Sequence, residues 1–326
     1  MREDELLEWL RGRLERRGWT RVGDDAAELP EGRYVTTVDT QIAGVHFTED
    51  LEPRLLARRL LAVNLSDLAA MGAEPAYAFL ALSAPPTFAF KPFFSALIEA
   101  CARASVELAG GDLSSQPRCT AVLTLLGRPA GRVLRRSGGG PGHALWIGGP
   151  IGESALGCRL VARGARLRSG RVTLPSGLSG RPAAEAAARR AVRRHLEPRP
   201  QLELGRWLAG AEEGAAMDVS DGLGRDLHRL CRASGTGAEI EAEALRPPRD
   251  LEPLLEELGL RWLDLALGGG EDYVLLFSLP AGDEPPRELG CRRLGRLVAG
   301  DEIRLVRAGD GRAWPLPPAG FDHLVA

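Results

Sequence analysis

The sequence predicts an α/β protein with two domains. Its 326 residues are about twice the length of a typical domain. Segments with helical spacing of apolar residues alternate with β-branched segments from the start of the chain. The turn-rich stretch SGGGPGH at 137–143 separates two such halves. We therefore expect an N-terminal domain over 1–137 and a C-terminal domain over 138–326.

The first half alternates helices and strands. Leucines at helical spacing predict a helix over 3–17, and RYVTTVDT predicts a strand over 33–40 that ends in a carboxylate. Pro53 is expected to open the next helix, because proline is favoured at the first helical position. The series continues with a strand, a helix and a strand over 76–83, 91–108 and 120–127.

The second half repeats this alternation. ALWIGGP predicts a strand and IGESALGC the start of a helix, whereas the stretch 166–182 is expected to be an exposed loop. Further strands are predicted in GAAMDVSDGL, TGAEIEAEAL, EDYVLLFSLP, CRRLGRLVAG and EIRLVRAG. The fold class is therefore α/β in both halves.

Composition excludes several classes of function. The net charge of -2 and a pI near 6.3 give no basis for binding nucleic acid or an anionic membrane. No apolar run predicts a signal peptide or a bilayer span, so we expect a soluble, cytoplasmic protein. Five scattered cysteines without a CxxC pair argue against a zinc site or a disulfide framework. They are Cys101, Cys119, Cys158, Cys231 and Cys291.

Acidic residues beside glycines or at strand ends are the most informative feature. Clustered acids would repel one another unless cations neutralise them, and hard oxygen ligands suit Mg²⁺. Adjacent glycines let backbone N–H groups approach a phosphate closely. Together they indicate phosphoryl transfer, which needs alignment and charge neutralisation. The acids are Asp24, Asp25, Asp39, Asp67, Asp112, Asp218, Asp221, Glu271 and Asp272.

Each of these residues also has an ordinary interpretation. Asp221 alone would be a helix-capping acid, and Asp39 a solvated residue at a strand end. His46 alone would be an ordinary histidine and Phe321 a core residue. Asp67 is harder to dismiss, because aspartate is a poor helix former on an otherwise apolar helix. No P-loop, GxGxxG, protein-kinase or GxSxG motif is present, so the usual nucleotide-binding folds are unsupported.

Eight segments in fixed order carry a family resemblance. VGDDAA, TTVDTQIAGVHF, AVNLSDLAAMGAEP, GGDLSSQP, LRRSGGGPG, AMDVSDGL, GGGEDYVLLF and PAGFDHL span nearly the whole chain. The series resembles the thiamine-monophosphate kinase family of the aminoimidazole-ribonucleotide-synthetase-like superfamily. TTVDTQIAGVHF, AVNLSDLAAMGAEP and AMDVSDGL are the specific segments. This resemblance implies a mixed N-terminal sheet with helices that forms a barrel in a homodimer, and a C-terminal α/β sandwich domain.

The resemblance also implies an activity and a set of site residues. The γ-phosphoryl group of ATP would pass directly to thiamine monophosphate, giving thiamine diphosphate with several Mg²⁺ ions and no catalytic nucleophile or essential base. The implied metal ligands are Asp25, Thr37, Asp39, Asp67, Asp112, Asp218 and Asp221. Gly111, Asp112, Arg136 and Ser220 would bind ATP, and His46, Glu271 and Phe321 would contact the thiamine part.

Several positions depart from the family pattern. Val38 stands where threonine is common, so any metal contact there would use the backbone carbonyl. Leu113 and Gln116 replace frequent threonine and arginine in the segment implied to hold ATP. His143 and Glu153 each stand where an aspartate is usual. None of these changes removes a carboxylate from the implied metal set.

Two rival functions stay open at this point. Another enzyme of the superfamily, such as aminoimidazole ribonucleotide synthetase or a hydrogenase-maturation dehydratase, would use ATP to activate a carbonyl oxygen. TQIAGVHF and GGGEDY favour the thiamine-monophosphate kinase family over these enzymes. A non-catalytic ATP-binding protein on the same fold is the second rival, and retention of the metal acids argues against it.

Overall fold

The computed structural model describes residues 3–19, 29–175, 178 and 182–321. The chain divides into two compact units. The N-terminal unit comprises Met1–Leu68 and Ala73–Ala130, and the C-terminal unit comprises Ala69–Gly72 and Gly131–Ala326. The functional boundary expected between 137 and 138 stays a prediction.

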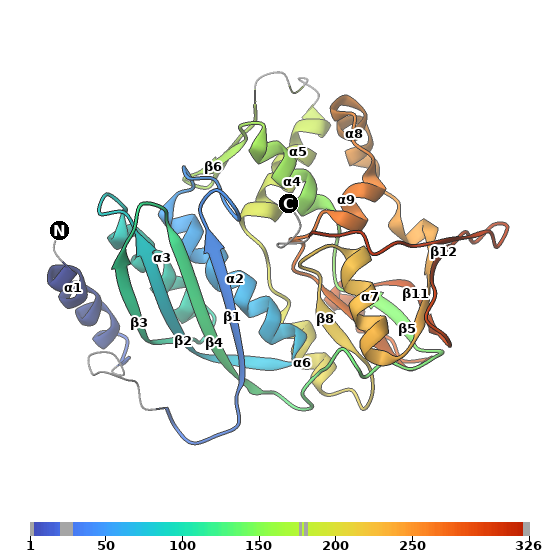
Figure 1. Ribbon diagram of the computed structural model, residues 1–326, viewed down its shortest axis with the longest axis horizontal. Coiled ribbons are helices and arrows are strands. Elements are labelled where there is room, and N and C mark those ends of the chain that lie inside the picture. The colour runs from blue at the N-terminus through green and yellow to red at the C-terminus, as the bar shows by residue number, and fades with distance from the viewer. Residues whose placement is uncertain (1–2, 20–28, 176–177, 179–181, 322–326) are drawn as a thin grey trace. The chain divides into compact units, whose positions relative to one another are not determined.

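A mixed sheet forms the centre of the N-terminal unit. Within the described residues it has four strands in the order β1-β4-β2-β3, with β2 and β3 parallel and the other neighbours antiparallel (Figure 1). The sheet is open, so a barrel would require strands from another chain. The strands are β1 (Val35–Ile42), β2 (Ala73–Ala84), β3 (Glu107–Ser115) and β4 (Thr120–Pro129).

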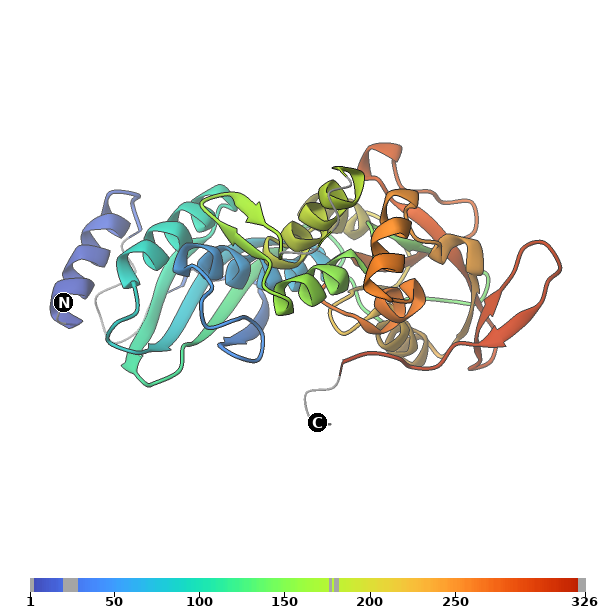
Figure 2. The same cartoon turned by 90° about the horizontal axis from the view of Figure 1, so that it is seen from above.

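Helices cover one face of this sheet (Figure 2). Leu56 and Leu60 of α2 and Leu97 of α3 are buried, as are the inward-facing strand residues Leu123 and Leu125. Alternation along the strands leaves the opposite face partly open. The helices are α1 (Glu3–Glu15), which packs on α3, α2 (Pro53–Ala70) and α3 (Phe90–Arg103).

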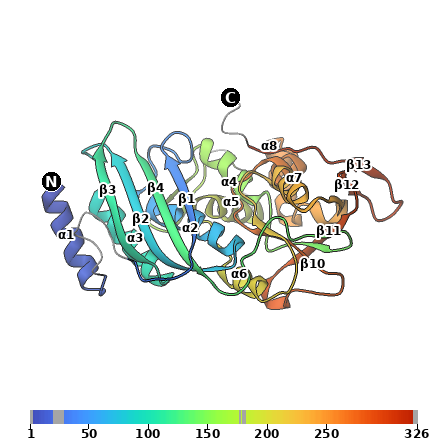
Figure 3. The same ribbon diagram turned by 60° about the horizontal axis from the view of Figure 1, so that its bottom comes forward.

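A second mixed sheet organises the C-terminal unit (Figure 3). Its order within the described residues is β13-β12-β9-β11-β5-β10-β8, and only β12 and β9 run parallel among these neighbours. The strands are β5 (Ala144–Ile147), β8 (Ala216–Asp218), β9 (Gly237–Glu241), β10 (Leu275–Leu279), β11 (Arg292–Val298), β12 (Ile303–Val306) and β13 (Ala313–Pro315).

The helices of the C-terminal unit bury apolar faces against this sheet and one another. Leu204 and Leu208 of α6 join Phe277 of β10 in a buried cluster, and α7 contacts β8 and β9. No described helix has the length and apolar character needed to cross a bilayer. The α-helices are α4 (Glu153–Ala162), α5 (Pro182–Leu196), α6 (Leu202–Ala209), α7 (Leu223–Ser234), α8 (Glu252–Leu258) and α9 (Trp262–Gly268). Short 3₁₀ turns occupy Ala242–Leu245, Arg249–Leu251 and Arg287–Leu289.

The α/β class is confirmed, but two predicted elements were wrong in part. The stretch expected to be a loop contains a hairpin of β6 (Arg166–Arg168) and β7 (Arg171–Thr173). Ser169 and Gly170 both adopt positive φ, the geometry of a two-residue hairpin turn. The helix expected to reach residue 108 ends at Arg103, because Ser105 takes a left-handed conformation before β3 begins.

Three loops of the C-terminal unit are joined by backbone hydrogen bonds. The N–H of Glu271 donates to the Ser220 carbonyl at 2.7 Å, and that of Tyr273 donates to the Val219 carbonyl at 2.8 Å. The N–H of Phe321 donates to the Asp221 carbonyl at 2.8 Å. Glu271 and Tyr273 adopt left-handed φ values of 57° and 50°, a conformation that side chains disfavour. These hydrogen bonds hold the strained residues in place.

A substitution at Gly270 tests how closely the loop of Glu271 approaches the loop of Ser220. A Cβ at Gly270 would lie 2.6 Å from the Ser220 carbonyl oxygen, whereas one at Gly290 would have no neighbour within 4 Å. Their φ values of 68° and 64° are nearly equal, so Gly290→Ala is a matched control. We expect Gly290→Ala to cost about 1 kcal/mol and Gly270→Ala about 3 kcal/mol, the difference arising from overpacking. Thermal unfolding of both variants measures this, and equal losses would contradict the close approach.

Candidate active site

Thr37, Asp39 and Asp67 lie together in the N-terminal unit. Alternate residues of β1 face helix α2, where Asp67 lies in the last turns. The Thr37 hydroxyl donates to Oδ2 of Asp67 at 2.5 Å. Asp39 is close enough to Asp67 for the Asp67 carboxyl to raise its pKa through charge and hydrogen bonding. Three residues implied to bind metal therefore form one cluster of oxygen ligands.

The electrostatics of this cluster are unfavourable for two free carboxylates. Burial raises the pKa of Asp39 to about 7, and the charge of Asp67 and its hydrogen bond add to the effect. A hydrogen bond between two carboxyl groups requires a proton on one of them. A divalent cation would take over the role of that proton, so the donor set and its charge fit Mg²⁺.

Asp112 is placed away from this cluster within one chain. It lies on edge strand β3, whereas Asp39 lies on the opposite edge strand β1. Across the sheet, Asp39 pairs with Leu123, Leu123 with Leu80, and Leu80 with Gly111, the neighbour of Asp112. Three strand spacings therefore separate β1 from β3 at this level, roughly 14 Å. Packing alone requires a glycine at position 111, because a Cβ there would lie 2.0 Å from the Leu80 carbonyl oxygen.

The C-terminal unit brings a second group of implied site residues together. Strand β8 ends at Asp218, which is buried, and Asp221 follows three residues later. Asp226 at the start of α7 accepts the backbone N–H groups of Ser220 and Asp221 at 3.0 Å each. Arg229 pairs with Asp221 at 2.6 Å and with Asp226 at 2.7 Å. The buried carboxylate of Asp226 thus holds the loop from Asp218 to Asp221 in one conformation through these hydrogen bonds.

Residues implied to contact substrate flank this loop. Phe321 is 51% exposed, although its backbone N–H bonds to Asp221 and its carbonyl accepts from Arg225. Glu271 lies 3.1 Å from Nδ1 of buried His195. The ordinary interpretation of Phe321 as a core residue is therefore wrong. The loop contacts fix its backbone and leave its ring accessible.

Two further residues were implied to bind substrate or ATP, and one more to bind metal. His46 belongs to the N-terminal unit, and its Nδ1 accepts the backbone N–H of Ile42 at 3.1 Å, which places the ring proton on Nε2. Arg136 in the C-terminal unit has an exposed side chain, while its carbonyl accepts from the Ser234 hydroxyl. Asp25, the remaining implied metal ligand, lies outside the described residues, as does Asp24.

The departures from the family pattern have local explanations in part. Val38 is 56% exposed and points away from the carboxylate cluster, because successive strand residues face opposite sides. Glu153 is buried and pairs with Arg190 at 3.1 Å. Gln116 donates to Thr120, and His143 lies 3.8 Å from Glu213. Nothing in the described contacts explains Leu113.

Sequence reasoning missed Asp226 and Arg229, and it missed the contact that Asp272 makes. Asp226 and Arg229 form an (i, i+3) pair in the first turns of a helix, a spacing that was readable from the sequence. Asp272 accepts the N–H groups of Gly152 and Ser154, and burial raises its pKa to about 7. Gly152 and Asp272 are 120 positions apart in the sequence, so no local sequence pattern predicts their hydrogen bond.

Asp226 provides a test of loop support. Asp226→Ala leaves two partly buried backbone N–H groups without their carboxylate acceptor, and we expect a loss of about 2 kcal/mol of stability. Asp264→Ala is the control, because Asp264 pairs with Arg261 at an exposed (i, i+3) position and should cost about 0.5 kcal/mol or less. Chemical denaturation of the two variants measures both values. Similar small losses would show that Asp226 does not support the loop.

Known proteins resemble the chain over nearly its full length. The model of the AIR synthase related protein N-terminal domain matches residues 23–128. The thiamine-monophosphate kinase of Salmonella typhimurium is 36% identical, covering 94% of this chain and 92% of its own, and that of Escherichia coli is 34% identical, covering 93% and 91%.

Solved structures agree with these relatives. Thiamine-monophosphate kinase from Stenotrophomonas maltophilia has a TM-score of 0.77 and 32% identity, covering 95% of this chain and 96% of its own. AaThiL complexed with AMPPCP and TMP has a TM-score of 0.75 and 27% identity, covering 99% of each chain. Hydrogenase maturation protein HypE in complex with ATP, at 15% identity and a TM-score of 0.74, covers 99% of this chain and 95% of its own and shares the fold alone. The chain belongs to the thiamine-monophosphate kinase family.

Proposed function

We propose that this chain transfers the γ-phosphoryl group of ATP to the phosphate of thiamine monophosphate, giving thiamine diphosphate and ADP. Membership of the thiamine-monophosphate kinase family carries the proposal. The crowded carboxylates of Asp39 and Asp67 support it, because phosphoryl transfer needs a site that gathers cations around polyphosphate. The acceptor phosphate is already ionised near neutral pH, so no side chain is assigned as a base.

Mg²⁺ is the metal that the donor set fits. Thr37, Asp39 and Asp67 would hold it in the N-terminal unit, and the resemblance adds Asp25, Asp112, Asp218 and Asp221. When bound, Mg²⁺ offsets the negative charge of the phosphate oxygens. In this proposal the Thr37 hydroxyl orients Asp67 through its hydrogen bond. Asp226 similarly keeps the Asp218–Asp221 loop in one conformation.

The remaining assignments concern ATP and thiamine monophosphate. Gly111, Asp112, Arg136 and Ser220 are proposed to bind ATP, the Arg136 guanidinium being suited to phosphate by its fork of donors. His46, Glu271 and Phe321 are proposed to contact the thiamine part. The exposed Phe321 ring offers a flat apolar surface for an aromatic ligand. Its backbone bond to Asp221 ties this substrate contact to the proposed metal loop.

A homodimer is the proposed assembly, and the cytoplasm the proposed location. Asp39 and Asp112 lie on opposite edges of one sheet, so one chain's sheet does not bring both to a single ion. The open face of that sheet, with Val38 exposed, would pack against a second copy. We infer that each site combines Asp39 of one copy with Asp112 of the other. We propose no nucleic-acid or membrane partner.

Mixing two inactive variants tests the shared site. We expect Asp39→Asn and Asp112→Asn to be inactive alone, and to regain about one quarter of wild-type activity after unfolding and refolding together. Half of the reassorted dimers would be mixed, and each mixed dimer would keep one intact site. Sedimentation confirms that dimers have formed. Absence of recovery in mixed dimers would place each site within one chain.

Substitution of Asp39 tests, through activity and stability, whether Asp39 and Asp67 bind the metal. Asp39→Asn should lower kcat at least about 100-fold, measured as thiamine diphosphate formed from ATP, Mg²⁺ and thiamine monophosphate. Without divalent cations the same change should raise the melting temperature, because it removes a buried charge beside Asp67. Mg²⁺ should then raise the melting temperature of the wild type more than that of the variant.

The raised pKa of Asp39 also predicts how the metal-free stability of the protein depends on pH. The folded-state pKa of Asp39 is raised from 3.8 to about 7, so the folded protein holds more protons than the unfolded one between these values. Metal-free stability should fall as pH rises across that range, and Asp39→Asn should flatten the fall. Glu15→Gln, at an exposed position of α1, is the charge-matched control and should change neither property. Unaltered kcat in Asp39→Asn would reject the ligand assignment.

Product analysis separates the rival functions. Formation of ADP and thiamine diphosphate in equal amounts supports the kinase. ATP hydrolysis without thiamine diphosphate favours an enzyme that activates a carbonyl oxygen, and ATP binding without turnover favours a non-catalytic protein. Either of these last two outcomes rejects the proposed activity.

A further inference from the structure

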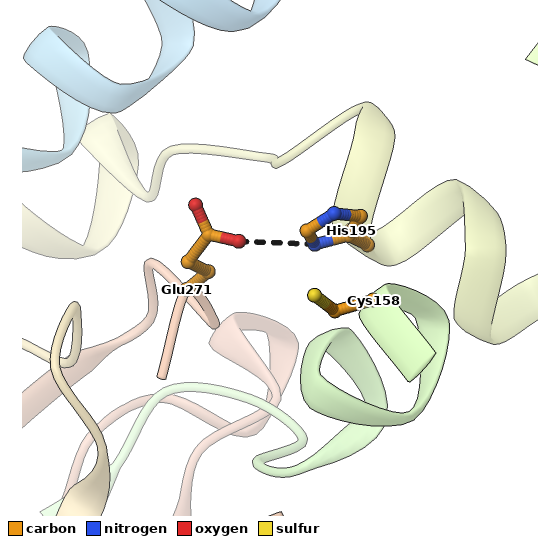
Figure 4. Close-up of side chains that lie close together, drawn as sticks. All are labelled: Cys158, His195 and Glu271. Carbon is orange, nitrogen blue, oxygen red and sulfur yellow. Dashed lines mark ion pairs between the residues drawn. The ribbon is translucent and has the colours of Figure 1, made fainter. Parts of the chain in front are cut away.

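Cys158, His195 and Glu271 form a compact cluster of three potential metal ligands in the C-terminal unit (Figure 4). One ligand atom from each lies within 4.8 Å of the other two, and His195 Nδ1 is 3.1 Å from Glu271 Oε2. The residues come from α4, the end of α5 and the loop before β10. The cluster therefore joins three parts of the unit.

Backbone packing sets the positions of all three. A Cβ at Gly157 would lie 2.1 Å from the Ala191 carbonyl oxygen and 2.8 Å from Cβ of His195, so α4 and α5 cross in close contact. That crossing places Cys158 beside His195. Glu271 is fixed separately, by its left-handed backbone and its N–H bond to Ser220. The three ligands are held by rigid neighbours, as a preformed site requires.

The chemistry of the cluster differs from that of the proposed magnesium residues. A thiolate, an imidazole and a carboxylate together suit a borderline-soft ion such as Zn²⁺, whereas Mg²⁺ prefers oxygen ligands. Tetrahedral zinc would hold such ligand atoms about 3.4 Å apart, a separation that rotation of the Cys158 and Glu271 side chains would reach. His195 is 5% exposed, whereas Cys158 is exposed and leaves an entry path.

We propose that Cys158, His195 and Glu271 bind a zinc-class divalent cation, and that its binding inhibits the enzyme by engaging Glu271. The inhibitory part rests on the proposed function, because Glu271 is there assigned to the thiamine part of the substrate. Water would fill the fourth position on the ion. Cysteine spacing gives no signal for such a site, because its ligands are 37 and 76 positions apart in sequence.

Cobalt spectroscopy tests binding without any substrate. Co²⁺ added to the anaerobic protein should give a near-ultraviolet thiolate-to-cobalt charge-transfer band, which oxygen-only sites do not produce. Cys158→Ala should abolish the band, while Cys291→Ala, at a cysteine outside the cluster, should retain it. Zn²⁺ should displace the Co²⁺ and remove the band. No band in the wild type, or an equal band in Cys158→Ala, overturns the proposed site.

Inhibition is tested separately with excess Mg²⁺ present. Zn²⁺ should inhibit thiamine diphosphate formation by the wild type, and a chelator should reverse this, which excludes thiol oxidation. Cys158→Ala should keep its basal activity and need at least about tenfold more Zn²⁺ for the same inhibition. Equal sensitivity of the two proteins overturns the inhibitory role. A cobalt band in a protein without kinase activity would support the metal site and reject the proposed function.

Discussion

The main constraint on the N-terminal unit is the placement of the Asp39 carboxyl against Asp67 in a poorly hydrated position. Neither side chain gains stability from this arrangement while both are charged, because burial and repulsion act in the same direction. The surrounding packing must supply the free energy that keeps them together. Leu56 and Leu60 of the same helix are buried against the sheet and provide it. Apolar packing thus stabilises a cluster whose charge is relieved by a shared proton, a role that the proposed cation would take over.

Much of the fold follows from local sequence pattern. Helix α2 begins at the predicted Pro53, and β1 and β4 cover the β-branched stretches. The errors occur where backbone conformation overrides residue pattern. Ser105 ends α3 early through a left-handed turn, and Ser169 turns an expected loop into a hairpin. A non-glycine residue with positive φ has no reliable sequence signal, so such points escape prediction.

The candidate site was predictable to a different extent in each unit. The family resemblance assigned both Asp39 and Asp67 to the metal site. The strand order that places Asp112 on the edge strand opposite β1 could not be read from the sequence. In the C-terminal unit, the contacts of Asp272 and His195 connect residues far apart in the chain. Long-range contacts depend on tertiary packing, whereas motifs report only local neighbours.

The crossing of α4 and α5 has a consequence for substitutions at its two neighbouring positions, 157 and 158. Gly157, and not its neighbour, determines how near the two helices come. Position 158 is exposed, so exchanging its side chain leaves the crossing intact. A single codon change there would add or remove a sulfur ligand without disturbing the fold. Under the proposed zinc site, one substitution at this position would add or remove the response to zinc-class ions while leaving the helix crossing and the proposed magnesium residues unchanged.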